Sequence, residues 1–251
     1  MSELNADTVA IVTEKLRRAS ENSTQLFNAG FEAGRVHADD LFWYSMQAGG
    51  ERTNYDYVFR DTRWDKPFVP KYSFGNVIKA TYTFALTKVG DNLYTDKLDF
   101  SKCNSMVSTF FSSDVIKLKK IDMRSCTADF NGAASTFAWC ESLKEISEFY
   151  PPINTDFSNT FRGCSELETL NICSEITVNG MDLSDCKKLS RASIESIMNN
   201  LSINTSGLTI RLSKDAVNKA YERTEGANDG EMSESWIDWL NITGHWNIAL
   251  V

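Results

Sequence analysis

Cysteine is the residue type in this sequence with the widest chemistry, and the spacing of the six cysteines favours none of it. They are Cys103, Cys126, Cys140, Cys164, Cys173 and Cys186. No two of them follow the C-x-x-C spacing of a zinc site, and only two histidines are present to complete a ligand set. The sequence shows no secretion signal, so we expect the thiols to stay reduced. Because free cysteine is among the most buried residue types, the sequence predicts inert thiols packed in a core.

The two histidines and their acidic neighbours do not form a recognisable catalytic pattern. His37 precedes Asp39 and Asp40, a grouping open to a metal or acid–base role, although we expect a solvated helix end there. His245 stands next to Trp246, and we expect it to be structural or exposed.

A polar loop near the C-terminus is the remaining candidate for ion binding. Asn228, Asp229 and Glu231 offer oxygen ligands but lack the full spacing of a calcium loop. The sequence also has no phosphate-binding loop, no G-x-S-x-G motif and no cysteine with a plausible histidine base. We therefore predict a protein that is not an enzyme, with no catalytic residue, no cofactor and no metal.

The cysteines belong instead to a repeating pattern. The stretches "STFAWCESLKEI" (135–146) and "NTFRGCSELETL" (159–170) place phenylalanine, cysteine and leucine three residues apart, and they are offset by 24 residues. Equivalent phenylalanines are separated by 26, 27 and 24 residues; they are Phe84, Phe110, Phe137 and Phe161. An aliphatic series with steps of 23, 25 and 24 follows them, made up of Leu98, Ile121, Ile146 and Leu170. A period of this length, with one short strand per unit, is typical of a solenoid.

The strand of each unit predicts a parallel sheet with one solvent-facing side. Alternation in "KLDF" and "KIDM" points Leu98, Phe100, Ile121 and Met123 inward and Asp99 and Asp122 outward. The outward residues form a polar face of mixed charge, suited to protein or glycan contacts but also to plain solvation. They include Lys97, Asp99, Lys120, Asp122, Glu145, Ser147, Thr169 and Asn171. Asp99 and Asp122 would be neighbours there, and paired acids are also what a depolymerase needs, an option we rank last.

Four regions follow from these patterns. Residues 1–40 hold an N-terminal helix whose small residues are spaced for close helix packing, either on the protein itself or as an anchor or oligomerisation segment. Residues 41–75 form an aromatic cap, and residues 76–189 form the leucine-rich-repeat-like solenoid. Residues 190–251 break the period and are expected to form an α/β cap.

The C-terminal cap has readable elements. We expect a helix over "LSRASIESIMNNLS" capped by Ser190 or Ser193, a strand over "LTIRLS", a second helix over "SKDAVNKAYER" and a closing strand over "HWNIALV". A helical turn over "SWIDWLNI" lies between the last two. The residues large enough to cover the end of the core are Trp236, Trp239 and Trp246. The fold class is therefore predicted as an α/β solenoid with a short parallel sheet, an N-terminal helix and a C-terminal α/β cap.

Bulk properties exclude several partners. The 251-residue chain has a formal net charge of −8, which disfavours nucleic acid and anionic membrane. No stretch approaches the roughly 20 apolar residues of a membrane span, so we expect synthesis in a cytosol and no membrane insertion.

The repeats and their flanks resemble a known family. "LDFSKC", "STFAWCESLKEI" and "NTFRGCSELETLNI" resemble BspA-type leucine-rich repeats. The segment "LFWYSMQAGGERTNYDYVFRDTRWDKPFVPKY" before them and the ending "LTIRLS … GHWNIALV" are similar to the flanks of such repeats in proteins of bacteriophages and prophages. The resemblance covers about residues 40 to 251, and the ending departs from the usual "GW" by the insertion of His245.

The resemblance implies a non-enzymatic phage virion protein made in the host cytoplasm. It would be associated with the tail, baseplate or fibre and act in structure, in host-receptor recognition or in both. Its expected partners are other virion proteins, contacted through the N-terminal helix in a homo-oligomer, with a trimer favoured, and a host surface protein or glycan. The alternative is a bacterial leucine-rich-repeat adhesin or protein-interaction module, in the bacterial cytoplasm or on the cell surface.

Overall fold

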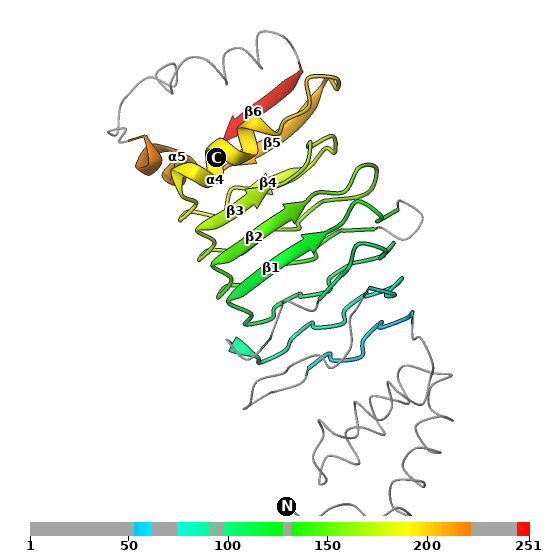
Figure 1. Ribbon diagram of the computed structural model, residues 1–251. Coiled ribbons are helices and arrows are strands. Elements are labelled where there is room, and N and C mark those ends of the chain that lie inside the picture. Colours follow the sequence, from blue (N-terminus) through cyan, green and yellow to red (C-terminus); the bar gives the residue numbers. More distant parts are fainter. Residues whose placement is uncertain (1–52, 62–74, 91–92, 94–97, 128–131, 222–244) are drawn as a thin grey trace, which may run out of the picture.

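The computed structural model describes residues 53–61, 75–90, 93, 98–127, 132–221 and 245–251 (Figure 1). The expected N-terminal helix and most of the aromatic cap lie outside these residues. Strands and turns of the described chain lie one above another in a single stack, with β1 lower and β6 near the opposite end. The elements are β1 (Lys117–Asp122), β2 (Glu145–Tyr150), β3 (Thr169–Ile172), β4 (Met181–Leu183), α4 (Arg191–Asn199), β5 (Leu208–Leu212), α5 (Lys214–Ala220) and β6 (Trp246–Leu250).

The first sheet has the order β1-β2-β3, and its strands are parallel. Leu118 pairs with Ile146, which pairs with Leu170, and all three side chains are fully buried. Ile121 pairs with Phe149 one step further along. The predicted equivalence of Ile121 with Ile146 is therefore wrong. Both Leu118 and Ile121 point inward although they are three residues apart, and Leu118, not Ile121, is the residue of β1 that pairs with Ile146.

Five phenylalanines stack through the interior. Ring centroids of neighbouring members lie 5.0, 5.2, 5.6 and 5.6 Å apart, and neighbouring ring planes are inclined by at most 22°. The members are Phe59, Phe84, Phe110, Phe137 and Phe161. The predicted stacking of Phe110, Phe137 and Phe161 is confirmed, and the stack extends to Phe59, which precedes the expected start of the repeats at residue 76.

The phenylalanines meet the inward residues of the strands at the centre of the stack. Phe149 of β2 lies 6.4 Å from Phe137 and 5.6 Å from Phe161, in edge-to-face contact with both rings. The edge of Phe100 contacts Phe110 in the same way at 6.1 Å. Two opposite walls therefore share one close-packed core, as aromatic edge-to-face geometry favours.

The backbone around each phenylalanine repeats a single conformation. We call these stretches the phenylalanine segments; they are residues 57–61, 82–86, 108–112, 135–139 and 159–163. The residues two before and two after each phenylalanine have positive φ. Amides at every second position donate to carbonyls of the next segment, as in Phe84 N–H to Thr109 O and Phe110 N–H to Thr136 O, at 2.7 and 2.8 Å. The segments are thus joined by a ladder of backbone hydrogen bonds without being β-strands.

A buried threonine precedes four of the five phenylalanines. Its hydroxyl donates to a carbonyl of the preceding pass of the chain, as in Thr109 to Ala80 O at 2.8 Å and Thr136 to Met106 O at 2.9 Å. Each hydroxyl is therefore satisfied in the core, which removes the cost of burying it. The members are Thr83, Thr109, Thr136 and Thr160.

Helix α4 takes the place of a strand beside β3. The amides of Leu170 and Ile172 donate to the hydroxyls of Ser193 and Ser196, at 3.0 and 2.9 Å. The Ser193 hydroxyl in turn donates to Glu168 O at 3.0 Å. Serine side chains thus satisfy the edge of the sheet, which would otherwise be open to pairing with another chain. Ser190 is the N-cap of α4, as one of the two predicted alternatives, and Ser193 closes the sheet edge instead.

The second sheet has the order β4-β5-β6 and is also parallel. The stretch "MDL" was predicted to continue the series of β1 to β3, but it forms β4 and pairs with β5. Cys186, which follows β4, repeats an earlier contact, because its thiol lies 3.8 Å from Phe161 O as the Cys164 thiol lies 3.1 Å from Phe137 O. Residues 181–186 therefore contact the last phenylalanine segment, while α4 lies beside β3.

Three further expectations for the C-terminal region are confirmed. β5, α5 and β6 lie where the strand, helix and closing strand were predicted. Trp246 is 2% exposed and its indole nitrogen donates to Ser202 O at 2.8 Å. Trp236, Trp239 and the loop with Asn228, Asp229 and Glu231 lie outside the described residues.

Truncating the centre of the phenylalanine stack should be strongly destabilising. Phe137 is fully buried between Phe110 and Phe161, so Phe137→Ala should lower the free energy of unfolding by about 4 kcal/mol. Urea denaturation followed by circular dichroism measures the change. Ile153→Ala is the control, because Ile153 is 57% exposed and should change it by less than about 0.5 kcal/mol. Equal effects of the two substitutions would contradict the packing described here.

Removing the hydroxyl that closes the sheet edge should also be costly. Ser193→Ala leaves the buried Leu170 amide and Glu168 O without this partner, and we expect a loss of about 2 kcal/mol in the free energy of unfolding. Ser206→Ala removes an exposed hydroxyl and serves as the control. Hydrogen exchange of the Leu170 amide should quicken in the Ser193 variant alone; unchanged exchange would show that this hydroxyl does not protect the edge.

Candidate functional site: two side faces

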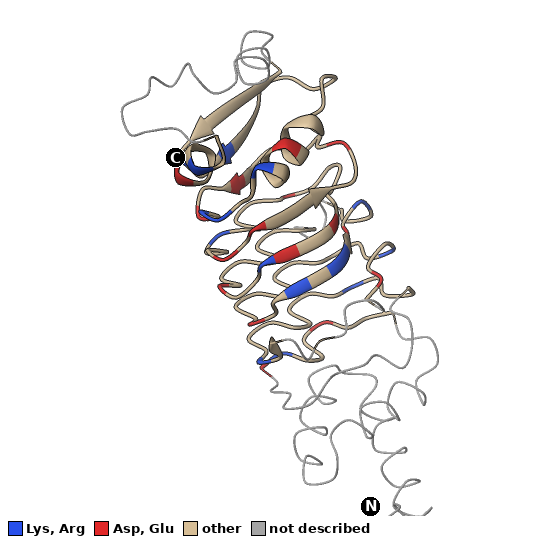
Figure 2. Ribbon diagram, turned by 60° about the vertical axis from the view of Figure 1, so that its left-hand side comes forward, with Lys and Arg blue, Asp and Glu red and all other residues tan. Residues whose placement is uncertain are grey.

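The strand face, formed by outward side chains of β1 to β3, is charged and partly neutralised. Lys117 lies 3.4 Å from Glu145, and Glu145 also accepts a hydrogen bond from Ser147 at 2.6 Å. The outward charged residues of β1 are mainly lysines, and those of β2 are glutamates (Figure 2). The hydrogen bond from Ser147 lowers the pKa of Glu145 most, and the hydrogen bond and charge of Lys117 lower it further. Partial burial raises the pKa but does not outweigh them. Such paired, exposed charges contribute little stability each.

The predicted binding residues of this face differ in exposure. Thr169 and Asn171 are exposed, while Asp99, Lys120, Glu145 and Ser147 are half-buried. Lys97 lies outside the described residues. Asp122 is buried, with its side chain 3% exposed, so the expectation that it points to solvent is wrong.

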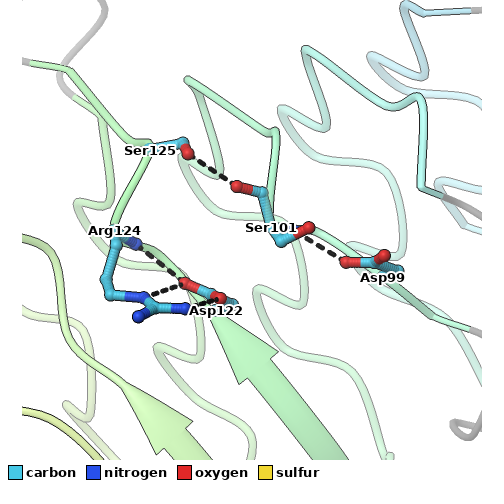
Figure 3. A network of polar contacts seen from close by, with 5 residues as sticks. All are labelled: Asp99, Ser101, Asp122, Arg124 and Ser125. Carbon is cyan, nitrogen blue, oxygen red and sulfur yellow. Dashed lines mark hydrogen bonds and ion pairs between the residues drawn. The ribbon is translucent and has the colours of Figure 1, made fainter.

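Asp122 is buried because Arg124 covers it. The guanidinium binds both carboxylate oxygens, at 3.0 and 2.7 Å (Figure 3). The same guanidinium lies over the Tyr150 ring at 4.5 Å, and Lys120 approaches that ring at 5.2 Å. A bidentate pair stacked on an aromatic ring is a stable way to bury a carboxylate.

Asp99 has a similar local role. It accepts the Ser101 amide at 2.9 Å and so forms the turn after the inward Leu98. Partial burial raises the pKa of Asp99, but the bonds from Ser101 and the charges of Lys120 and Lys102 outweigh it and leave the pKa below its ordinary value. In Figure 3 Asp99 and Asp122 each contact a residue of their own turn, Ser101 and Arg124. Asp99 therefore lacks the raised pKa that a general acid requires.

Five of the six thiols are buried, as predicted, and they form two series. Cys140, Cys164 and Cys186 each approach the carbonyl of a phenylalanine of the preceding pass, at 2.8, 3.1 and 3.8 Å. Cys126 approaches Cys103 O at 3.5 Å. Burial raises the pKa of Cys103 and of Cys164 to about 12, so these thiols stay protonated at neutral pH. Cys173 differs, because it is partly exposed.

The outer face of the phenylalanine segments is the second side face, and the sequence analysis did not identify it. Exposed or half-buried aromatic and apolar side chains stand on this face, with an arginine stacked at each end. They are Tyr57, Tyr82, Leu86, Phe111 and Trp139, with Arg60 and Arg162. The signal was present in the sequence, because these residues lie one or two positions to either side of a repeat phenylalanine. Only the backbone conformation of the segments shows that side chains at these positions face outward.

Trp139 is the largest exposed side chain of this outer face. It is 42% exposed, and the Arg162 guanidinium lies 5.2 Å from its ring. The ring also lies against Gly163, where an added Cβ would come within 2.6 Å of Trp139 Cε3. Because Gly163 has no side chain, the indole can lie in this position.

The two histidines lie in different parts of the chain. His37 lies outside the described residues, and His245 Nδ1 lies 3.1 Å from Thr205 O, a structural contact. Within the described ranges, no three His, Cys, Asp or Glu side chains cluster as a metal site would require. Over the same ranges, no helix has the length and apolarity needed to cross a bilayer.

Comparison with known proteins adds no relative. No protein-family model, curated protein or solved structure matches this chain.

Substituting Gly163 should displace Trp139. Gly163→Ala adds a Cβ that collides with the indole and strains a φ of +73°, so we expect a loss of about 3 kcal/mol in the free energy of unfolding. Gly180→Ala is the matched control, since its φ is +87° but nothing lies within 4 Å of the added Cβ. It should cost only about 1 kcal/mol. In a Trp139→Ala background, Gly163→Ala should cost only about as much as Gly180→Ala in the free energy of unfolding, measured by urea titration. If it still cost about 3 kcal/mol there, the contact between Gly163 and the indole would be contradicted.

Proposed function

We propose that the chain winds as an α/β solenoid of leucine-rich-repeat-like coils and acts as a non-enzymatic virion protein of a bacteriophage. The observation that carries the fold is the recurrence of the same contacts between successive passes of the chain. The backbone bonds that join the phenylalanine segments recur with partners 23 to 26 residues apart, from Tyr57 N–H to Thr81 O through Trp139 N–H to Arg162 O. A period of this length supports a solenoid.

The proposed role is structural, in host recognition, or both, in a tail, baseplate or fibre. It rests on the resemblance of the repeats and flanks to BspA-type proteins of phages, and on the shape of the described body. That body has two long side faces: one charged, over β1 to β3, and one aromatic, over the phenylalanine segments. A rigid body with long open faces suits recognition of an extended surface partner, because little conformational entropy is lost on binding.

Residues 1–40 are proposed to be the attachment element. Their small-residue stripe suits a helix–helix interface in a homo-oligomer, with a trimer favoured. The virion, assembled in the host cytoplasm, is the proposed location.

The oligomeric state tests this role. In size-exclusion chromatography with light scattering, the full chain of 28.3 kDa per copy should elute with the mass of three copies. Deleting residues 1–40 should give a single copy with an unchanged circular dichroism signature of the remaining strands. A full-length chain that stays monomeric at micromolar concentration would remove the proposed anchor.

Gene order separates the proposal from its alternative. Genes for tail or baseplate components on both sides would support the virion role. Flanking genes for export or surface anchoring would favour a bacterial leucine-rich-repeat adhesin instead.

A further inference from the structure

The charges of the strand face are segregated by strand. β1 carries three lysines, and its one acidic residue, Asp122, is buried. β2 carries Glu145 and Glu148 and no basic residue, and β3 carries no charge. Figure 2 shows the basic strand and the acidic strand side by side. Because neighbouring strands of a sheet lie about 4.8 Å apart, a strip of positive charge runs directly beside a strip of negative charge.

The lysines and glutamates also lie at matching heights along the two strands. In the register of the parallel ladder, Lys117 is opposite Glu145 and Lys120 is opposite Glu148. The side chains of Lys117 and Glu145 are 66% and 32% exposed, although their charged groups lie 3.4 Å apart. Both therefore keep surface that a second partner can reach. The Lys120 ammonium lies 5.2 Å from the centre of the Tyr150 ring, so its charge stands at the border of β1 and β2.

This pattern of charges is complementary to itself. A two-fold axis parallel to the strands, lying above the sheet between β1 and β2, places β1 of one copy over β2 of another and preserves the height of each residue. Lys117 then faces Glu145 of the second copy, and Lys120 faces Glu148 of the second copy. A two-fold axis across the strands would instead place lysine over lysine. The charges therefore select one of the two face-to-face arrangements.

We infer that the outward face of β1 and β2 is a docking surface for a second copy of this chain, related to the first by a two-fold axis parallel to the strands. Such a contact uses the same patch on both copies. Sheets packed face to face lie about 10 Å apart, with their strands aligned to within about 30°. Lysine and glutamate side chains that extend from both sheets can span this gap. The inference goes beyond the proposed virion role and does not depend on the anchor of residues 1–40.

The contact joins charges into networks. Lys117 and Glu145 of one copy meet the same pair of the second copy, which gives a group of four alternating charges. Isolated exposed ion pairs contribute little to stability, and networks are the exception to that rule. The patch is small, because three strands of four to six residues cover roughly 300 Å², whereas a stable specific interface covers about 800 Å² on each partner. We therefore expect a weak association that increases with protein concentration.

Charge complementarity favours a second copy over other partners. A partner must present an acidic strip opposite β1 and a basic strip opposite β2 at the spacing of adjacent strands. Nucleic acid and anionic membranes present negative charge alone, which Glu145 and Glu148 repel. This chain itself carries both strips in the required register.

Charge reversal on one strand at a time, followed by mixing, tests the contact in the full-length chain. The acidic variant is Lys117→Glu with Lys120→Glu, and the basic variant is Glu145→Lys with Glu148→Lys. Each variant has lysine or glutamate alone at the four positions, so two copies of it repel, whereas one copy of each variant attracts the other. Light scattering and sedimentation velocity measure the association over a concentration series at an ionic strength of about 0.15 M, where the Debye length is about 8 Å. Thermal unfolding verifies that each variant is folded.

The original chain should show a mass that rises with concentration to at least twice its value at low concentration, whether that value is one copy or three. Each variant alone should associate at least about tenfold more weakly, because like charges then face each other. An equal mixture of the two variants should associate at least as tightly as the original chain. This recovery requires that both variants are folded.

A second pair of variants controls for net charge. Lys187→Glu with Lys219→Glu, and Glu141→Lys with Asp215→Lys, change the net charge by the same amounts at exposed residues outside the strand face. These variants should associate as the original chain does, both alone and mixed.

Four outcomes would each overturn the inference. They are a mass of the original chain that does not rise with concentration, a charge-reversed variant that associates with itself at the original strength, a mixture that does not recover, and a control mixture that gains as much as the test mixture. None of them bears on the virion role, whose anchor is tested by deleting residues 1–40. Conversely, a chain that is monomeric at low concentration would remove the anchor and leave this contact standing.

Discussion

The ladder of backbone hydrogen bonds between phenylalanine segments is the constraint on which the rest of the structure depends. Each segment holds two residues with positive φ, and nine of those described are not glycine. Such conformations cost on the order of 1 kcal/mol each and persist only where surrounding structure enforces them. Here amides such as those of Phe84 and Phe110 bond to the next segment, so each segment fixes its neighbour. The stacked phenylalanine rings lie directly beneath this ladder and exclude water from it.

This constraint also separates the inward and outward residues. Around Phe137 the two left-handed positions turn the side chains of Ser135 and Trp139 outward, whereas Ser108 at such a position is buried. Interior positions accept only side chains that fill the core or bond within it, which explains the threonines before the phenylalanines and the thiols after them. Exterior positions are free to vary, and function is proposed to lie there.

The open edge of a parallel sheet is the second problem that the fold solves. β3 has no strand on its far side, and α4 supplies Ser193, Ser196 and Asn200 in its place. Side-chain hydroxyls and an amide thereby form the hydrogen bonds that a neighbouring strand would form with β3. The substitution lets the chain change from strands to helices without exposing unpaired backbone, which protects the assembled protein from edge-to-edge association.

The two side faces of the described body differ in chemistry, so in the proposed virion role they would contact different partners. On the charged strand face, Asp122 and Arg124 form an ion pair, and Arg124 lies over the Tyr150 ring. The face of the phenylalanine segments exposes Trp139, and Arg60 and Arg162 lie over aromatic rings at its two ends. The two faces therefore differ in character, one carrying paired charges and the other exposed aromatic side chains.

The stacked interior could be predicted from the sequence alone. The spacing of Phe110, Phe137 and Phe161 and of their cysteines predicted a stacked core, because residues that fill equivalent interior positions must recur with the period of the chain. Tertiary structure alone decided the strand register, the helix that replaces a strand beside β3 and the surface of Trp139. Side chains three apart can both point inward where a strand is irregular, as Leu118 and Ile121 do. The exposed residues stand at fixed positions beside the repeat phenylalanines, but their types do not repeat, since nothing in the core restricts them.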